Sequence, residues 1–205
     1  DYALELAQVA GGYRLFGEPD GDKSGACNND VVCPIGDGWR DDIQTVGAYS
    51  TGGSIFCTGA MVNNTANDGT PYFITANHCL DDDEMASTLE AYFQWWVPCG
   101  AECPSQWGNP AGVPRVLGAS VVATNTVSDY TLLKLSQPAP AGTALLGWTS
   151  EPVAYTDGAA LYRVSHPKGS PQAYSEHRVD TGAPQCWQWP RGDRIYSRDV
   201  IGATQ

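Results

Sequence analysis

The sequence predicts an all-β protein, built as a sandwich or a barrel. Charged residues make up only 17% of the 205 residues, whereas Gly (23), Pro (14), Trp (7) and Tyr (10) are plentiful. This mixture is typical of strands joined by turns. Short runs rich in β-branched and aromatic residues recur between turn residues. No apolar period of 3.6 residues is sustained over three helical turns, and no long repeat is visible.

The expected strands follow one another along the chain with turn residues between them. From the N-terminus they span residues 45–50, 54–58, 72–75, 89–97, 119–123, 130–135, 160–164 and 194–197. The strand at 130–135 alternates and then ends before Pro138-Ala-Pro140, which we take as a domain boundary. We therefore expect one domain over 24–137 and the beginning of another over 138–205. Residues 1–23 end with a stretch rich in Gly, Pro and Asp, which is typical of turns and linkers.

Charge and hydropathy exclude several classes of function. The chain has 11 Lys and Arg against 23 Asp and Glu, a net charge of -12. Nucleic acids and anionic membranes both reward clustered cations, so neither is an expected partner. No apolar run approaches the roughly 20 residues that span a bilayer, so no transmembrane segment is expected.

The chain contains seven cysteines. They are Cys27, Cys33, Cys57, Cys79, Cys99, Cys103 and Cys186. No pair of CxxC knuckles is present, and a zinc site built from Cys99, Cys103 and a histidine is the minor alternative. The favoured interpretation is a set of disulfides formed in an oxidising compartment, with one thiol left over by the odd count.

Only three histidines are present, and one of them stands out. His166 precedes a proline and His177 lies in a polar stretch, so both are expected to be structural or solvent-facing. His78 closes a strand-like apolar run and is followed at once by Cys79. A disulfide at Cys79 would fix the backbone beside the imidazole, as a general base requires. The alternative is a partly buried histidine beside a core disulfide.

Several segments around His78 carry a resemblance to a known family. They are Cys57-Thr-Gly59, Thr75-Ala-Asn-His-Cys79, Ser128-Asp-Tyr-Thr-Leu-Leu133, the cysteine-bearing stretch 24–34, and Val62-Asn-Asn-Thr-Ala-Asn67. Together they closely resemble the lysyl endopeptidase group of secreted bacterial trypsin-like serine proteases. The resemblance is strong over 24–79, clear around Asp129, and patchy over 138–205. The order of a His followed by an Asp that opens an apolar strand matches the chymotrypsin-like proteases.

The resemblance implies a chymotrypsin-like double antiparallel β-barrel, with the second barrel incomplete in this chain. It implies that His78 is the general base and that Asp129 orients it. It also implies a Cys57–Cys79 disulfide and a pairing of Cys33 with Cys99 or Cys103. Cys27 would pair with a cysteine beyond Gln205.

The implied activity is cleavage of proteins or peptides after a basic residue, with Lys preferred, by a secreted monomer. No metal or organic cofactor is expected. In this family the chain in front of the first cysteine is removed, so residues 1–23 are expected to be the tail of a propeptide cut at Lys23-Ser24. The alternative is that they stay attached as a cover or linker.

The chain departs from the family at the nucleophile. It contains no GxSGxP-like motif, and Ser128, Ser165 and Ser197 lack the neighbouring glycines that an oxyanion hole needs. The last seven residues resemble the stretch before that motif, so we expect the serine to follow Gln205 and this chain alone to be inactive. The rival hypothesis is a catalytically inactive, protease-like binding or scaffold module. A Cys/His hydrolase is a weaker third, because Cys79 adjoins His78 in sequence.

Two further patterns have a structural and a functional interpretation. The acidic run 81–84 lacks the alternating ligands and glycine of a calcium loop, so we expect a solvated turn. The pairs Trp95-Trp96 and Trp187-Gln-Trp189 would stack on a ligand if exposed, but we expect them in the core.

Overall fold

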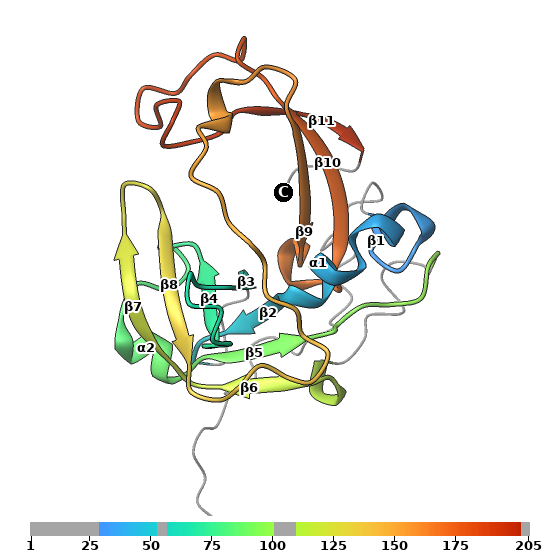
Figure 1. The fold of residues 1–205 in the computed structure, drawn as a ribbon, viewed down its shortest axis with the longest axis vertical. Coiled ribbons are helices and arrows are strands. Elements are labelled where there is room, and N and C mark those ends of the chain that lie inside the picture. The colour runs from blue at the N-terminus through green and yellow to red at the C-terminus, as the bar shows by residue number, and fades with distance from the viewer. Residues whose placement is uncertain (1–28, 53–56, 101–109, 202–205) are drawn as a thin grey trace, which may run out of the picture.

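The computed structural model describes residues 29–52, 57–100 and 110–201, whose regular structure is mostly β (Figure 1). Two antiparallel sheets, of seven and four strands, hold these residues together. The all-β prediction is therefore confirmed. The helices are short, and none in the described part of the chain is long and apolar enough to cross a membrane.

The seven-stranded sheet has the strand order β6-β5-β2-β3-β4-β8-β7. Its strands are β2 (Val46–Ser50), β3 (Cys57–Val62), β4 (Tyr72–Thr75), β5 (Glu90–Phe93), β6 (Arg115–Leu117), β7 (Ala119–Asn125) and β8 (Tyr130–Leu135). The helix α2 (Asp83–Ser87) lies between β4 and β5 in sequence, and the 3₁₀ turn η2 (Pro110–Gly112) precedes β6.

Gly118 closes this sheet on itself. β6 pairs with β5 at one edge, and β7 pairs with β8 at the other, yet the two edge strands are consecutive. Between them Gly118 has φ +74° and bends the chain, a conformation that a side chain would disfavour. Its N–H donates to the Leu89 carbonyl, and its carbonyl accepts from Ser136 N–H (2.7 and 2.9 Å). The two edges thus meet in one bent strand, and the sheet forms a barrel.

Large apolar side chains that alternate along the strands fill the barrel. Tyr49, Met61, Phe73, Phe93 and Leu133 are all completely buried. The Phe73 ring meets Tyr49 and Phe93 edge to face, with centroids 5.9 and 6.0 Å apart. This packing gives the loops at the barrel rim a rigid base.

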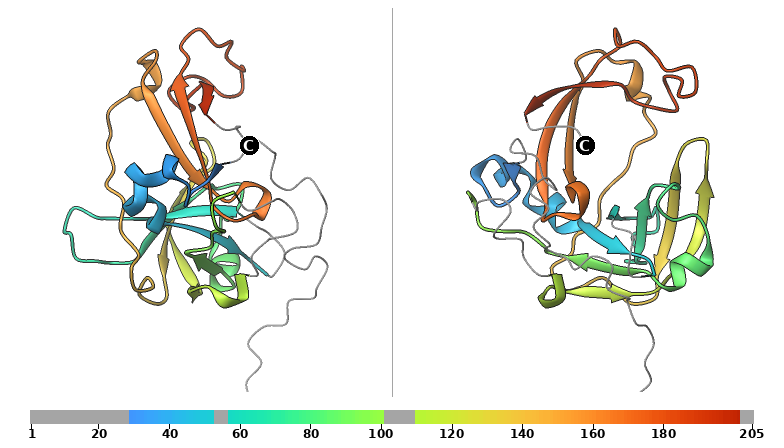
Figure 2. Two further views of the ribbon diagram at one scale, coloured as in Figure 1. Left: turned by 90° about the vertical axis from the view of Figure 1, so that its right-hand side faces the viewer. Right: turned by 180° about the vertical axis from the view of Figure 1, so that it is seen from behind.

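The second sheet is open and is formed by β1 (Asn29–Asp30), β9 (Ala160–Ser165), β10 (Ala173–Val179) and β11 (Ser197–Ile201). β10 pairs with β9 on one side and with β1 and β11 on the other. The second sheet curves away from the barrel, as the view from behind also shows (Figure 2). The short turns η3 (Val153–Tyr155) and η4 (Pro167–Gly169) flank β9.

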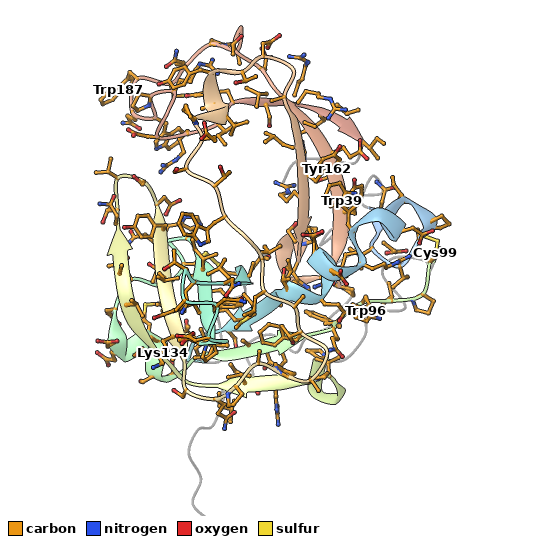
Figure 3. All side chains as sticks on the ribbon, viewed as in Figure 1. Trp39, Trp96, Cys99, Lys134, Tyr162 and Trp187 are labelled. Atoms are coloured by element: carbon orange, nitrogen blue, oxygen red, sulfur yellow. A yellow bond between two sulfur atoms is a disulfide. The ribbon has the colours of Figure 1, made fainter. Side chains whose placement is uncertain are left out.

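The helices η1 (Pro34–Trp39) and α1 (Arg40–Thr45) lead from β1 into the barrel. Trp39 packs on Tyr162 of β9, with ring centroids 4.1 Å apart (Figure 3). Buried Gln172 donates its side-chain N–H groups to the carbonyls of Ile43 and Val46, at 3.2 and 2.7 Å. The second sheet is therefore bound to the entrance of the barrel by polar as well as aromatic contacts.

Several strand boundaries differ from those expected. β3 begins at Cys57, and residues 54–56 of the expected strand lie outside the described part. β5 ends at Phe93 rather than 97, and the last strand begins at Ser197 rather than 194. β10 was not expected at all, because Ser, Glu, His and Arg in its centre conceal its alternation.

Candidate active site

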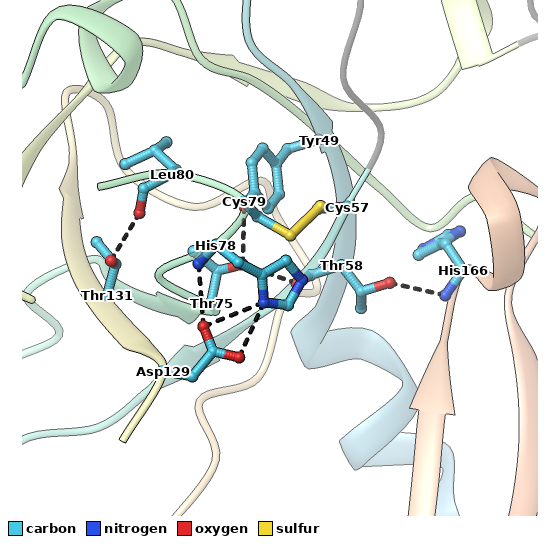
Figure 4. Close-up of a disulfide and its surroundings, with 10 residues drawn as sticks. All are labelled: Tyr49, Cys57, Thr58, Thr75, His78, Cys79, Leu80, Asp129, Thr131 and His166. Carbon is cyan, nitrogen blue, oxygen red and sulfur yellow. Dashed lines mark hydrogen bonds and ion pairs between the residues drawn. A yellow bond between two sulfur atoms is a disulfide. The ribbon is translucent and has the colours of Figure 1, made fainter. Parts of the chain in front are cut away.

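The turn that carries His78 is anchored on both sides. Its amides at Cys79 and Leu80 donate to the Ala76 carbonyl (3.2 and 3.3 Å). The carbonyl of Leu80 accepts a 2.6 Å hydrogen bond from the buried hydroxyl of Thr131 on β8 (Figure 4). The turn is therefore tied to the strand that Asp129 immediately precedes.

A disulfide adds a covalent anchor beside His78. Cys79 is bonded to Cys57 at the start of β3, with Cα atoms 6.4 Å apart (Figure 4). The structure also pairs Cys33 with Cys99. Cys27 and Cys103 lie outside the described residues, and Cys186 is exposed with a free thiol.

Asp129 ends the tight turn between β7 and β8 with a backbone φ of 55°. Asp and Asn adopt this left-handed conformation more readily than other side chains. The turn is closed by Ser128 N–H, which donates to the side chain of Asn125 (2.8 Å). This geometry turns the carboxylate back toward the loop after β4.

His78 and Asp129 form a close pair. The Nδ1 atom of His78 lies 2.8 and 3.0 Å from the two carboxylate oxygens, and the backbone N–H of His78 donates to Oδ1 at 3.0 Å. A carboxylate accepts, so Nδ1 carries a proton, and in the neutral imidazole Nε2 then keeps its lone pair. The His78 side chain is 71% exposed, against 27% for Asp129. The imidazole is thus fixed at one nitrogen and open at the other, as a general base should be.

The surroundings keep Asp129 ionised. Partial burial opposes ionisation, but hydrogen bonds from the backbone and ring of His78 outweigh it, assisted by the charges of His78 and Arg194. Together they hold the pKa of the Asp129 carboxyl below its usual value.

A cleft of about 390 Å³ opens beside the pair. Its lining residues are His78, Asp129, Trp189, Arg194, Ile195 and Tyr196. The last four belong to the 180–196 loop between β10 and β11, so the cleft lies between the barrel and a loop of the second sheet. No serine or cysteine lines this cleft within the described residues.

The other two histidines are buried rather than solvent-facing. His166 is 4% exposed, and its ring stacks on Trp95. His177, also 4% exposed, lies between Ser175 and Asp199. Both are therefore structural, and the alternative of solvent exposure is wrong.

The described residues, which do not include Cys103, hold no cluster of three metal-ligating side chains. Cys99 forms a disulfide with Cys33, so its sulfur is not a free thiolate ligand. In the acidic run, Asp82 caps α2 by accepting from Met85 N–H, and Asp83 accepts from Val121 N–H (2.8 and 2.7 Å).

The expectation that both tryptophan pairs are core residues is half right. Trp95 is 2% exposed, but Trp187 and Trp189 are 88% and 51% exposed. Trp187 projects from the outer loop of the second sheet (Figure 3). Their spacing suggested a strand, whereas they lie in an irregular loop where no periodicity buries them.

Sequence reasoning missed Arg194 and Tyr196 as cleft residues. They are 65 residues or more from Asp129 in sequence, and no motif marks their segment. Only the fold of the second sheet brings them to the barrel.

Known proteins share part of this sequence. A family model described as "Lysyl endopeptidase, C-terminal domain" matches residues 21–194. The lysyl endopeptidase of Pseudomonas aeruginosa is 28% identical over 169 residues, covering 76% of this chain and 35% of that protein. The chain thus spans about a third of the length of this relative.

Solved structures are similar at a lower level. The Rv3671c protease of M. tuberculosis, in an inactive form, matches with a TM-score of 0.49 and 15% identity, covering 85% of this chain and 72% of its own. The MamO protease domain from Magnetospirillum magneticum matches with a TM-score of 0.43 and 17% identity, covering 71% and 66%.

Proposed function

This chain belongs to the family of lysyl endopeptidase C-terminal domains, and from that premise we propose that it carries the base and the orienting acid of a serine endopeptidase. His78 is the general base and Asp129 is its partner. The serine nucleophile comes from sequence beyond Gln205, since the chain has no GxSG motif. The 205 residues alone are then inactive.

The geometry of the His78–Asp129 pair is the observation that carries this proposal. Asp129 holds Nδ1–H, so Nε2 is free to take the proton of a serine hydroxyl as its oxygen attacks the peptide carbonyl. The carboxylate stabilises the imidazolium that results. The imidazolium then gives its proton to the leaving amine, and an acyl-enzyme remains for hydrolysis by water.

The proposed substrates are proteins or peptides with a basic residue, Lys above all, before the cleaved bond. The lysyl endopeptidase relative supports this preference. The Arg194 guanidinium lines the cleft beside His78 and would repel a basic side chain. The pocket for that side chain is therefore proposed to lie outside the described cleft.

Secretion and processing complete the proposal. Two disulfides favour an oxidising compartment. Residues 1–23, which lie outside the described part, are proposed to be removed at Lys23-Ser24. N-terminal sequencing of the natural secreted product should then begin at Ser24, and a product beginning at Asp1 would count against removal.

The first experiment is to read the coding sequence after the codon for Gln205 and to express the complete product. A GxSG serine within the first few codons, labelling by a fluorophosphonate and cleavage after Lys are the expected results. His78→Gln should lower kcat/KM about 10⁴-fold or more, and Asp129→Asn about 10⁴-fold. Asp157→Asn removes the same charge from an exposed loop and should leave kcat/KM unchanged.

A complete product that lacks the serine, resists the label and cleaves no peptide would overturn the protease proposal. The second candidate, an inactive binding module, would then lead. The exposed indoles of Trp187 and Trp189 favour it, because aromatic side chains at a surface are typical of binding sites.

A further inference from the structure

Arg194 is the point where the second sheet touches the turn that carries Asp129. Its Nη1 donates to the carbonyl of Val127 in the β7–β8 turn at 3.0 Å, and its Nη2 lies 4.0 Å from Asp129 Oδ2. The side chain is 29% exposed, so these contacts are partly shielded from water. A second cavity of about 220 Å³ lies beside the first, and Arg194 and Trp189 line both.

The loop around Arg194 is cross-linked by its own hydrogen bonds. Arg194 N–H donates to the Pro190 carbonyl (3.1 Å), and Tyr196 Oη donates to the Trp189 carbonyl (2.7 Å). Arg191 lies over the Tyr196 ring, 5.1 Å from its centroid, and donates to three loop carbonyls. These contacts hold the backbone from which the Arg194 side chain reaches the barrel.

We propose that Arg194 is a positioning residue for the His78–Asp129 pair. It clamps the β7–β8 turn through Val127 and presents a fixed positive charge to the outer oxygen of Asp129. The importance of this role for catalysis rests on the proposed function. The contacts themselves are observed among the described residues.

Arg194 acts on Asp129 in two ways, by holding the β7–β8 turn in position and by placing a positive charge near the carboxylate. The Asp129 carboxylate accepts the hydrogen bonds from the backbone and ring of His78 most strongly when it is ionised, and a cation about 4 Å away favours that form. The charged groups near this carboxylate are His78 on the turn after β4 and Arg194 on the opposite loop. Asp193, next to Arg194 in sequence, lines the second cavity.

The test is a carboxyl titration by ¹³C NMR on the 205-residue chain. Arg194→Gln should raise the pKa of Asp129 by roughly half a pH unit, and high salt should shrink the difference from the wild type. Arg194→Lys keeps the charge and should restore most of the wild-type value. A ¹H–¹⁵N spectrum of each variant verifies that it is folded.

Two arginines serve as matched controls. Arg178→Gln removes a cation from β10 of the second sheet, and Arg115→Gln removes a cation that pairs with Glu90 on β5. Neither residue lines either cavity. Both should leave the Asp129 titration unchanged. The proposal is overturned if Arg194→Gln has no effect, or if either control shifts Asp129 as much.

The measurement needs no nucleophile and no turnover. A complete product without protease activity would therefore refute the proposed function and leave this result standing. Conversely, an unchanged titration in an active protease would refute the role of Arg194 alone.

Discussion

At the scale of single residues, Asp129 combines a strained backbone with a reactive partner. A positive φ in a non-glycine residue costs of order 1–3 kcal/mol and persists only where the surroundings enforce it. Here the turn closed by Asn125 and the contacts with His78 supply that enforcement. The turn therefore holds Asp129 in the one conformation in which its carboxylate meets His78.

The buried imidazole of His166 should make the folded protein less stable in acid. Burial lowers the pKa of its imidazole from 6.5 to about 4, although Nδ1–H is bonded to the Ser170 carbonyl. The unfolded chain binds the proton more readily, so the free energy of unfolding should fall as pH drops from about 6.5 to about 4 and not change further below.

The comparison variant is His166→Gln, which cannot titrate. Urea unfolding at several pH values should show the wild type losing roughly 2–3 kcal/mol more than the variant over that interval. Parallel pH curves for the two proteins would show that this imidazole is not buried in the neutral form.

At the scale of elements, the Cys57–Cys79 bond joins β3 to the turn after β4. It spans 22 residues, and its loss should lower the free energy of unfolding by roughly 3 kcal/mol in the chain-entropy estimate. The double variant Cys57→Ala, Cys79→Ala tests this by denaturant unfolding. A change below about 1 kcal/mol would mean that the hydrogen bonds of the turn suffice without the disulfide.

A buried Ser–His–Asp hydrogen-bond chain, separate from the His78–Asp129 pair, lies across β10 and β11. Ser175 Oγ is 2.7 Å from His177 Nε2, and His177 Nδ1 is 2.9 Å from Asp199 Oδ1. Ser175 is only 5% exposed and sits in a strand that pairs on both sides, so no substrate reaches it. The network instead joins the two strands where their register shifts.

Asp199→Ala should therefore loosen β11 without unfolding the barrel. It leaves His177 Nδ1–H without its acceptor, at a cost of about 1–3 kcal/mol. Amide hydrogen exchange should accelerate in Ser197–Ile201 and stay slow in β8. Equal acceleration in both sheets would show instead that the network supports the whole molecule.

The elements also show what the sequence can reveal. Strands with clear β-branched and aromatic content, such as β4 and β8, were predicted at their observed boundaries. β10 was missed because its buried positions include Ser175 and His177, which read as surface residues until their partners on β11 are known. The hydrogen bonds that join Ser175, His177 and Asp199 depend on the tertiary structure, so the sequence alone does not reveal them.

At the scale of the whole molecule, the His78–Asp129 geometry is the part of the site that the sequence predicts, because a short motif surrounds each residue. The loop from Trp189 to Tyr196 was not predicted, since its place beside the barrel depends on how the second sheet docks. Gln172 and His166, which contribute to that docking, carry no sequence signal of it.

The open second sheet predicts self-association of the 205-residue chain. Among the described strands, β11 has no partner along its outer edge, and such edges pair with other chains. Sedimentation velocity should show larger species as concentration rises, and Val200→Lys on this strand should reduce them. A single monomeric species at every concentration would contradict this expectation.

The pairing of β1 with β10 has a consequence for biosynthesis. Asn29 lies opposite Tyr174, about 145 residues later, while the barrel strands end at Leu135. At roughly 5–20 residues per second on the ribosome, the first strand waits about 7–30 s for its partner. The barrel is complete only after Leu135, 39 residues before Tyr174, so it has to hold together for about 2–8 s of that interval. β1 then pairs with the later sheet when the barrel is already folded.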